Sequence, residues 1–235
     1  NKQQNKFENF PLIGGLMVSK IITEEGRKPM FMYRDKRCRP EDSGWRIFSG
    51  FESEEYTNNP NNTGIYNPST ILKIDSSIAD LLLKGIGSVY ERKSEKSDWY
   101  KVTDFPLEAD YIVDYPLTDR WPLSINNLFE HHIEEDGNLL FTTGDKSVRL
   151  TVWADKDKTR EQIYEKYKDI TKNRDKSKDK TLEISDFSDN KIAKVGYRIK
   201  ESDEQRKYDV IYAFSIIDES ILQSVFYFDN KEDID

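Results

Sequence analysis

Cysteine and histidine are scarce in this sequence, with one cysteine and two histidines among 235 residues. With Cys38 as its single thiol, the chain cannot form an internal disulfide or a multi-cysteine metal site. His131 and His132 are adjacent, so their side chains point to opposite faces of a strand or lie about 100° apart on a helix. Neither geometry brings both rings to one metal ion, so we expect no metal site and no cofactor.

Long apolar runs are missing as well. No segment approaches the ~20 apolar residues needed to cross a bilayer. The amino-terminal residues are polar, without the charged-then-apolar pattern of a leader. A chain with one cysteine also suits a reducing compartment. We therefore expect a cytoplasmic protein that does not contact membranes.

Positive charge is scarce in the second part of the chain. Residues 1–100 contain 15 Lys and Arg against 14 Asp and Glu, whereas residues 101–235 contain 21 against 30. The asymmetry indicates two units with different surfaces, although solubility alone would account for it equally well. Because phosphate contacts need a concentrated basic face, this balance disfavours nucleic-acid binding.

Short strands and helices are expected in the first part of the chain. The apolar segments at 16–22 and 29–34 flank a turn at 24–27 and predict a hairpin. The other elements expected here are a strand at 45–49, helices at 68–72 and 78–83, and strands at 87–92 and 99–102.

A connector rich in proline and acid is expected at residues 104–122, where the prolines disfavour a long helix. It would separate a domain at 10–103 from an acidic domain at 123–235. The expected elements predict an α+β fold for each domain, in which a mainly antiparallel sheet packs against one or two helices.

The second domain has the clearer periodicity. Residues 138–143 and 147–153 flank a Gly-Asp-Lys turn and predict a hairpin. A helix follows, with Ile163, Tyr167 and Ile170 at helical spacing. A lysine-rich loop at 172–180 and strands at 193–199, 208–217 and 221–228 complete the expected elements. At the level of fold, this arrangement resembles the Mog1/PsbP-type α/β sandwich.

The run from Asp42 to Tyr56 combines two glycines, a Trp, an Arg and three glutamates. It contains no recognisable nucleophile, metal cluster or phosphate loop. On an extended strand Glu52 and Glu54 would share one face and Glu55 the other, but two carboxylates supply too few ligands for calcium or magnesium. Cys38 lies between two arginines, yet this part of the chain has no histidine to act as its base. We predict that the protein is not an enzyme, against an alternative with a carboxylate site at Glu52 and Glu54.

Two interpretations of this run remain open. In the structural one, Asp42-Ser43-Gly44 forms a turn, Trp45 fills the core, and Arg46 pairs with one of the glutamates. In the other, Trp45, Arg46 and Tyr56 form a recognition surface, because Trp, Tyr and Arg dominate binding hot spots. The two are compatible, since a rigid turn can also present a surface.

The order of these motifs resembles a bacterial immunity-protein family, the one numbered thirty-three in the polymorphic-toxin classification. The similar segments, within residues 12–95, are Gly15–Ser19, Tyr33-Arg34, Asp42–Gly50, Glu52–Tyr56, Ile65–Asn67, Thr70–Leu72 and Gly87–Arg92. The resemblance implies a cytoplasmic protein that binds a cognate toxin of another bacterial cell and neutralises it by occlusion. It assigns no toxin-binding residues, and the second domain lies outside it.

The acidic second domain suggests where a toxin could bind. An immunity protein against a nuclease presents acidic groups to a basic cleft, and complementary potentials speed association. The candidates are Asp155, Asp157, Asp218, Glu219 and Asp229. The alternative function is a structural or regulatory interaction module with another partner.

Overall fold

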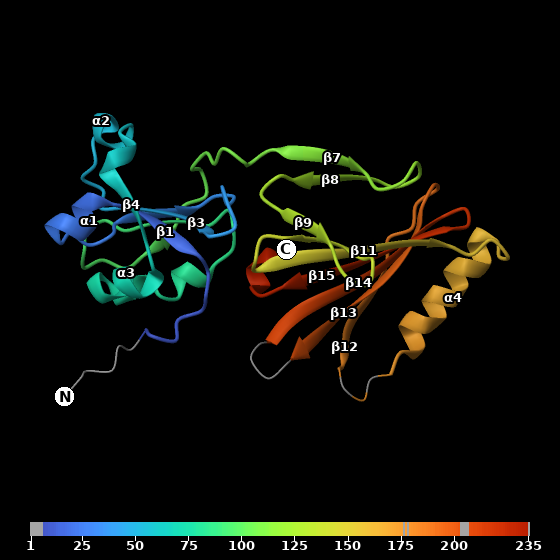
Figure 1. The fold of residues 1–235 in the computed structure, drawn as a ribbon. Helices are drawn as coiled ribbons and strands as arrows, with labels where there is room; N and C mark the ends of the chain where they lie inside the picture. Colours follow the sequence, from blue (N-terminus) through green and yellow to red (C-terminus); the bar gives the residue numbers. More distant parts are fainter. Residues whose placement is uncertain (1–6, 176, 178, 203–206, 235) are drawn as a thin grey trace. The chain divides into compact units, whose positions relative to one another are not determined.

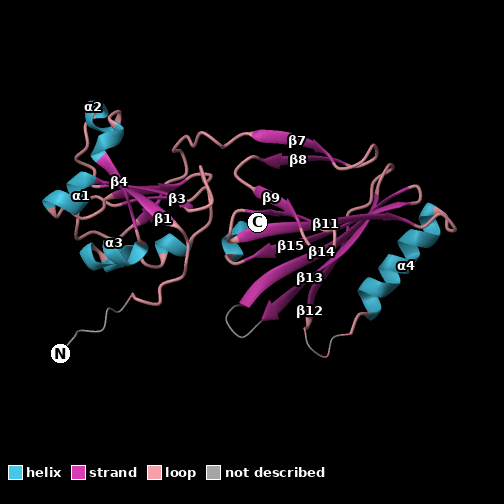
Figure 2. Ribbon diagram, viewed as in Figure 1, coloured by secondary structure: helices cyan, strands magenta, loops and turns pink. Residues whose placement is uncertain are grey.

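The computed structural model describes residues 7–175, 177, 179–202 and 207–234, and the polar residues 1–6 lie outside the described residues. The chain divides into two compact units, Asn1–Tyr111 and Ile112–Asp235 (Figure 1). Both are built from mainly antiparallel sheets with few helices (Figure 2), so the expected α+β fold class is confirmed. The division lies within residues 104–122, where the sequence predicts a connector.

The first unit contains a six-stranded sheet with strand order β4-β1-β3-β2-β5-β6. Its strands are β1 (Gly15–Ser19), β2 (Phe31–Arg34), β3 (Asp42–Phe48), β4 (Thr63–Tyr66), β5 (Val89–Glu91) and β6 (Tyr100–Lys101). β1 and β3 run parallel, and the other neighbours are antiparallel. The helical segments are α1 (Lys20–Glu25), α2 (Glu54–Thr57), η1 (Pro60–Asn62), α3 (Pro68–Ile74), η2 (Ser76–Ile78) and η3 (Leu81–Leu83).

The segment expected as one strand at 16–22 is a strand followed by a helix. The Ser19 hydroxyl accepts a hydrogen bond from the Ile21 backbone N–H at 3.3 Å and caps α1. Gly26, with a φ of 72°, ends this helix. The capped helix ends the strand before the chain can double back, so the predicted hairpin of 16–22 with 29–34 is wrong. Instead, β1 pairs with β3 and β4, and β2 pairs with β3 and β5.

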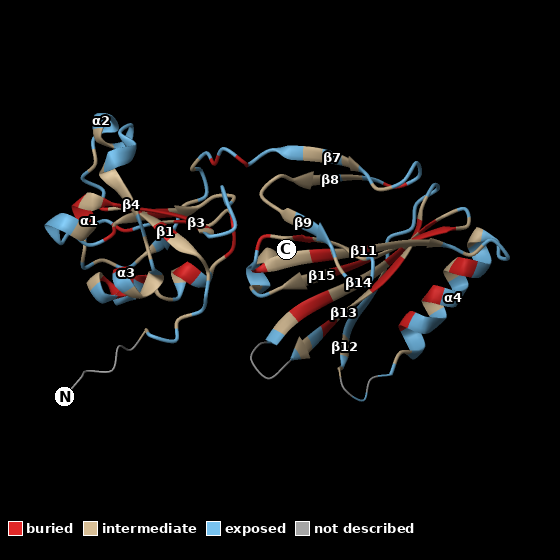
Figure 3. Cartoon of the chain, in the orientation of Figure 1, coloured by how far each residue is buried: buried red, intermediate tan, exposed pale blue. Residues whose placement is uncertain are grey.

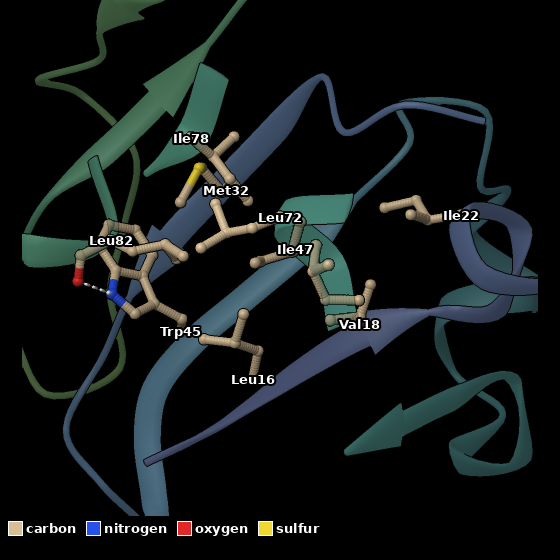
Figure 4. Packing of buried hydrophobic residues seen from close by; sticks show 10 residues of the cluster. Leu16, Val18, Ile22, Met32, Trp45, Ile47, Leu72, Ile78 and Leu82 are labelled. Carbon is tan, nitrogen blue, oxygen red and sulfur yellow. Dashed lines mark hydrogen bonds between the residues drawn. The ribbon is translucent and has the colours of Figure 1, made fainter. Parts of the chain in front are cut away.

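The core of the first unit lies between one face of the sheet and the helical segments at 68–83. Its fully or almost fully buried side chains (Figure 4) are Leu16, Val18, Ile22, Met32, Trp45, Ile47, Ile71, Leu72, Ile78 and Leu82. The predicted helix at 68–72 is confirmed as α3, whereas the one at 78–83 consists of parts of the short turns η2 and η3. The Trp45 indole Nε1 donates a hydrogen bond to the Leu82 carbonyl oxygen at 3.0 Å, which satisfies a polar group inside this core.

Gly44 occupies a position that a side chain would strain. Its φ is 84°, in the left-handed region, and a Cβ there would lie 2.1 Å from the Asp35 carbonyl oxygen. The two segments approach closely because the Asp35 backbone N–H donates to the Gly44 carbonyl oxygen at 3.0 Å. The backbone conformation and the close approach of Asp35 therefore require a glycine at this position of the Gly-Trp-Arg motif.

The second unit contains a seven-stranded antiparallel sheet with strand order β12-β13-β14-β15-β11-β10-β9, and a separate pair, β7-β8. Its strands are β7 (Ile112–Pro116), β8 (Pro122–Asn126), β9 (Glu130–Ile133), β10 (Leu139–Thr142), β11 (Lys146–Ala154), β12 (Thr181–Asp186), β13 (Ala193–Ser202), β14 (Lys207–Ile217) and β15 (Ser220–Phe228). Its helical segments are α4 (Arg160–Asn173) and η4 (Lys231–Asp233).

The hairpin predicted within 138–153 and the three strands after residue 192 are confirmed, but four strands are new. These are β7, β8, β9 and β12. β7 and the first residue of β8 belong to the predicted connector, and Pro116 pairs with Pro122 where the two strands meet their turn. Proline is tolerated there because the end of an exposed strand pair can lack a ladder N–H.

α4 and the β7-β8 pair cover opposite faces of the seven-stranded sheet. Ile163 and Tyr167 of α4 belong to one hydrophobic cluster with Trp153 of β11. Tyr115 of β7 packs in another cluster against Leu150 of β11. Because side chains alternate along a strand, Trp153 and Leu150 point to opposite faces. We call the first of these faces the α4 face.

α4 buries one side against the sheet (Figure 3). Thr159 and the residue three positions later form a capping box at its start. Ile163 and Tyr167 are buried as predicted, but Ile170 is 46% exposed and Thr171 is buried in its place. The positions four and eight residues after Ile163 face the sheet, since the helix repeats every 3.6 residues.

Candidate recognition surfaces

Arg46 pairs with Asp42, and the predicted pairing with a glutamate is wrong. The Arg46 Nη1 and Nη2 atoms donate to the Asp42 Oδ1 and Oδ2 atoms at 2.9 and 2.8 Å. The backbone N–H groups of Cys38 and Gly44 donate to the same carboxylate at 3.0 and 2.9 Å. Both charged side chains are about nine-tenths buried. This bidentate geometry is the strongest that an arginine and a carboxylate form, and it lies within one strand.

The acid sensitivity of the fold tests this pair. Burial raises the pKa of Asp42, but hydrogen bonds from Arg46, Cys38 and Gly44 outweigh it, so the pKa lies below its usual value. A carboxyl whose pKa is lower in the folded state stabilises the fold above its unfolded pKa of about 3.9, and that stabilisation is lost as the pH falls. We expect Asp42→Asn to lower the free energy of unfolding by about 2 kcal/mol at pH 7. The difference from the wild type should shrink below about pH 4.

Urea titrations of both proteins at pH 7, 5 and 3 measure this difference. Asp98→Asn, at an exposed position of the same unit, is the matched control and is expected to change the free energy of unfolding by less than about 0.5 kcal/mol. A difference between wild type and Asp42→Asn that stays constant from pH 7 to pH 3 would contradict the role of the pair.

Glu52 closes the turn after β3. Its carboxylate accepts hydrogen bonds from the Ser49 and Gly50 backbone N–H groups at 2.8 and 2.9 Å, and from the Ser49 hydroxyl at 2.8 Å. Burial raises the pKa of Glu52, but hydrogen bonds from Ser19 and Ser49 bring it below its usual value. The Glu52 carboxylate therefore stabilises this turn of the fold.

The other two glutamates of the run lie on a short helix. Glu54 and Glu55 are exposed in the first turn of α2, where negative charge is favourable. The Tyr56 hydroxyl donates to the Asn62 carbonyl oxygen at 3.2 Å. Because α2 begins at Glu54, Glu52 and Glu54 do not share an extended strand. Within the described part of the chain, no three potential metal-ligating side chains form a group. The geometry offers no support for a carboxylate site.

Trp45 is fully buried, which favours the structural interpretation of this residue, and a part for it in recognition stays a prediction. Among the aromatic residues of the run, Phe51 is the exposed one, at 54%. The Arg27 guanidinium lies 4.5 Å from the centroid of its ring. The Asp42–Tyr56 run therefore acts mainly inside the first unit.

The sheet face opposite Trp45 carries aromatic side chains that the motif search missed. Strand register places Phe31 beside Phe48, and Phe105 packs against Phe31 and Tyr33 with centroid distances of 5.1 and 5.0 Å. All four side chains are half-buried. We call Phe31, Tyr33, Phe48 and Phe105 the aromatic face. The signal that could have found it is alternation along β2, where Phe31 and Tyr33 flank a buried residue.

The aromatic face continues across the sheet. Met17 of β1 lies beside Arg46 of β3 and beside Ile65 of β4, so all three share that face. Ile65 is 65% exposed. Aromatic and apolar side chains therefore extend from β2 to β4 on one face of the first unit.

Four of the five acidic candidates lie at one end of the seven-stranded sheet. Asp155 and Asp157 belong to the loop between β11 and α4, and Asp218 and Glu219 form the β14-β15 turn. The Asp155 backbone N–H donates to the Glu219 carbonyl oxygen at 2.9 Å. Asp229 follows the other end of β15, about 30 Å away at ~3.3 Å per residue. The structure brings four candidates together and separates the fifth.

Basic side chains alternate with these four acids. The Lys158 Nζ lies 2.8 Å from the Asp155 Oδ2, and the Arg120 Nη1 lies 3.0 Å from the Glu219 Oε2. Hydrogen bonds from Lys158 and Arg120 lower the pKa values of Asp155 and Glu219. Lys156 lines the same end of the sheet. This end is a surface of mixed charge, and whether it contacts a partner stays a prediction.

Residues 16–103 match the family model of the immunity protein Imm33 domain. The matched segment lies within the first unit and contains the whole Asp42–Tyr56 run, so the resemblance of this domain to the immunity family is confirmed. The second unit lies outside the match. No curated protein matches the chain. Among the described residues, no helix combines the length and the apolar character needed to cross a membrane.

Proposed function

We propose that this chain is a cytoplasmic immunity protein that binds a cognate bacterial toxin and blocks it by occlusion, without catalysis. The observation that carries the proposal is the match of residues 16–103 to the Imm33 domain, because an immunity domain implies a toxin as its partner. On this proposal the partner is a protein, and we expect neither nucleic acid nor a membrane to be bound.

We assign the toxin contact to the aromatic face together with Met17 and Ile65. Two observations support this assignment. Asp42, Arg46 and Glu52 of the Asp42–Tyr56 run are engaged in hydrogen bonds within the fold. The aromatic face instead leaves large side chains partly exposed, and aromatic residues and Met are enriched where proteins bind each other.

The acidic residues of the second unit are the alternative contact. Asp155, Asp157, Asp218, Glu219 and Asp229 would suit a toxin with a basic cleft, and this contact would weaken as the salt concentration rises. The mixed charge around the first four reduces the potential that they can present.

Co-expression with the product of the adjacent open reading frame, as the candidate toxin, tests the proposed function. We expect growth to be restored and the two proteins to co-purify. No growth rescue together with no complex at low salt would overturn the proposal. A complex without growth rescue would favour a structural or regulatory module instead.

Substitution of Ile65 tests the assigned surface. We expect Ile65→Asp to weaken the toxin complex by at least about tenfold, because it places a charge within an apolar contact. Leu83→Asp, at another exposed apolar position of the same unit, is the matched control and should leave the affinity unchanged. Isothermal titration calorimetry measures both. Affinity lost through charge reversal at Asp218 and Glu219, and retained in Ile65→Asp, would place the contact on the second unit.

A further inference from the structure

We propose that a tyrosine-lined hollow on the α4 face of the second unit binds an arginine or lysine side chain presented by a protein partner. This inference rests on the proposed function only in identifying that partner as the toxin. The hollow has a volume of about 550 Å³ and opens on the sheet surface. The lining residues used below are Asp145, Lys146, Arg149, Glu201, Tyr208, Tyr227 and Asp229.

The tyrosines lie on the α4 face, where Tyr197 also packs against the cluster that contains Ile163 and Tyr167 of α4. Tyr197 pairs with Tyr212 across β13 and β14, and their stacked rings are 5.0 Å apart. Tyr208 and Tyr227 make an edge-to-face contact at 6.2 Å. The four half-buried tyrosines surround a buried floor of Ile199, Val210 and Val225. The rings are thus held by packing, and part of each remains exposed.

This surface already binds guanidinium groups of its own chain. The Arg149 guanidinium lies 5.5 Å from the Tyr227 ring centroid, and the Arg174 guanidinium lies 5.3 Å from the Tyr197 ring centroid. The Arg149 Nη1 also donates to the Tyr227 hydroxyl at 3.1 Å. Tyrosine ring faces attract cations through their quadrupole, and these two contacts show that the rings are oriented to do so.

The charge around the hollow also favours a cation. Each of its two basic residues is paired with a carboxylate, Arg149 with Glu134 and Lys146 with Asp233. Among the described residues that line the hollow, three carboxylates accompany these two basic residues: Asp145, Glu201 and Asp229. This excess of carboxylates among the described lining residues favours a basic side chain over a phosphate group.

Glu201 is the carboxylate that we place opposite the incoming cation. It accepts a hydrogen bond from the Tyr212 hydroxyl at 2.8 Å. Burial and this hydrogen bond raise the pKa of Tyr212, so its hydroxyl keeps its proton and holds the carboxylate in position. A fixed carboxylate beside tyrosine rings provides both an ion pair and a ring face for a guanidinium. The open face suits a side chain that a folded partner presents better than a small ligand that needs enclosure.

Titration with N-acetyl-arginine amide tests the hollow without any toxin. We expect saturable shifts of the Tyr208 and Tyr227 ring resonances, and none with N-acetyl-norleucine amide, which has no charge. Glu201→Gln should lower the affinity for N-acetyl-arginine amide by at least about threefold. Glu183→Gln, at an exposed position on β12, should leave this affinity unchanged. Circular dichroism confirms that both variants are folded. The proposal would be overturned if no saturable shift is seen, or if Glu201→Gln and the wild type bind N-acetyl-arginine amide with equal affinity.

A second arm, with the cognate toxin, separates this inference from the proposed function. A complex weakened by at least about tenfold in the double variant Glu201→Gln, Asp229→Asn, and not in Glu183→Gln, supports the toxin as the source of the cation. If arginine amide binds and the toxin does not, the hollow stands and the proposed function fails. If the toxin binds all variants equally and arginine amide does not bind, the hollow fails and the proposed function stands.

Discussion

Trp45→Ala is expected to lower the free energy of unfolding of the first unit by about 3–5 kcal/mol. The side chain is fully buried in the ten-residue core, and its removal leaves a cavity between β3 and the helical segment at 68–83. It also leaves the Leu82 carbonyl oxygen without its indole donor. Urea unfolding followed by circular dichroism measures the loss. Growth rescue should fall with it, because less of the protein is folded.

Two substitutions control for this result. Leu12→Ala removes a fully exposed side chain of the same unit and should change the free energy of unfolding by less than about 0.5 kcal/mol. Trp45→Phe keeps most of the ring volume and should cost less than Trp45→Ala. A Trp45→Ala protein of wild-type stability that fails to protect would instead give Trp45 a direct role in recognition.

Asp75→Ala is expected to lower the free energy of unfolding of the first unit by about 3–5 kcal/mol, as much as Trp45→Ala. The Asp75 carboxylate pairs with the Arg92 guanidinium, and the two side chains are 4% and 3% exposed. Arg92 Nε also donates to the Pro29 carbonyl oxygen at 2.8 Å, and the guanidinium lies 4.6 Å from the centroid of the Trp99 ring. Removing the carboxylate leaves this cation buried without its counter-ion, which costs far more than the pair contributes.

A comparison with an exposed pair isolates the effect of burial. The Lys20 Nζ and Glu24 Oε1 atoms are 4.0 Å apart at the surface. Glu24→Ala should lower the free energy of unfolding by less than about 0.5 kcal/mol. The double variant Asp75→Ala, Arg92→Met should recover part of the loss, since no charge is then left unpaired. If the free energy of unfolding of Asp75→Ala lies within about 0.5 kcal/mol of the wild-type value, Arg92 has found another partner.

Both predictions, with the acid sensitivity of the Asp42–Arg46 pair, concern residues that hold the first unit together. The proposed function accordingly assigns the toxin contact to side chains outside this set, such as Ile65 and the aromatic face. The second unit offers a different chemistry, in which tyrosine rings and carboxylates face solvent on an open half of a sheet. The two surfaces can be tested independently, because Ile65 and Glu201 lie in separate units.

Local patterns in the sequence predicted what depends on neighbours along the chain. The alternation around Val148 and Leu150 predicted the hairpin, and the spacing of Ile163 and Tyr167 predicted the buried side of α4. The motif order from Gly15 to Arg92 identified the immunity domain. The cap at Ser19 was present in the sequence as well, but a run of apolar residues around it indicated a strand more strongly.

By itself the sequence determined the class of fold and the immunity domain, because alternation, helical spacing and motif order are properties of short segments. Only the tertiary structure decided that Arg46 binds Asp42, that β3 lies between β1 and β2, and that Asp229 is separated from the other acidic candidates. It also assembled the aromatic face and the tyrosine hollow from strands far apart in the chain. Strand order and side-chain pairing depend on contacts between distant residues, and periodicity along one segment does not encode them.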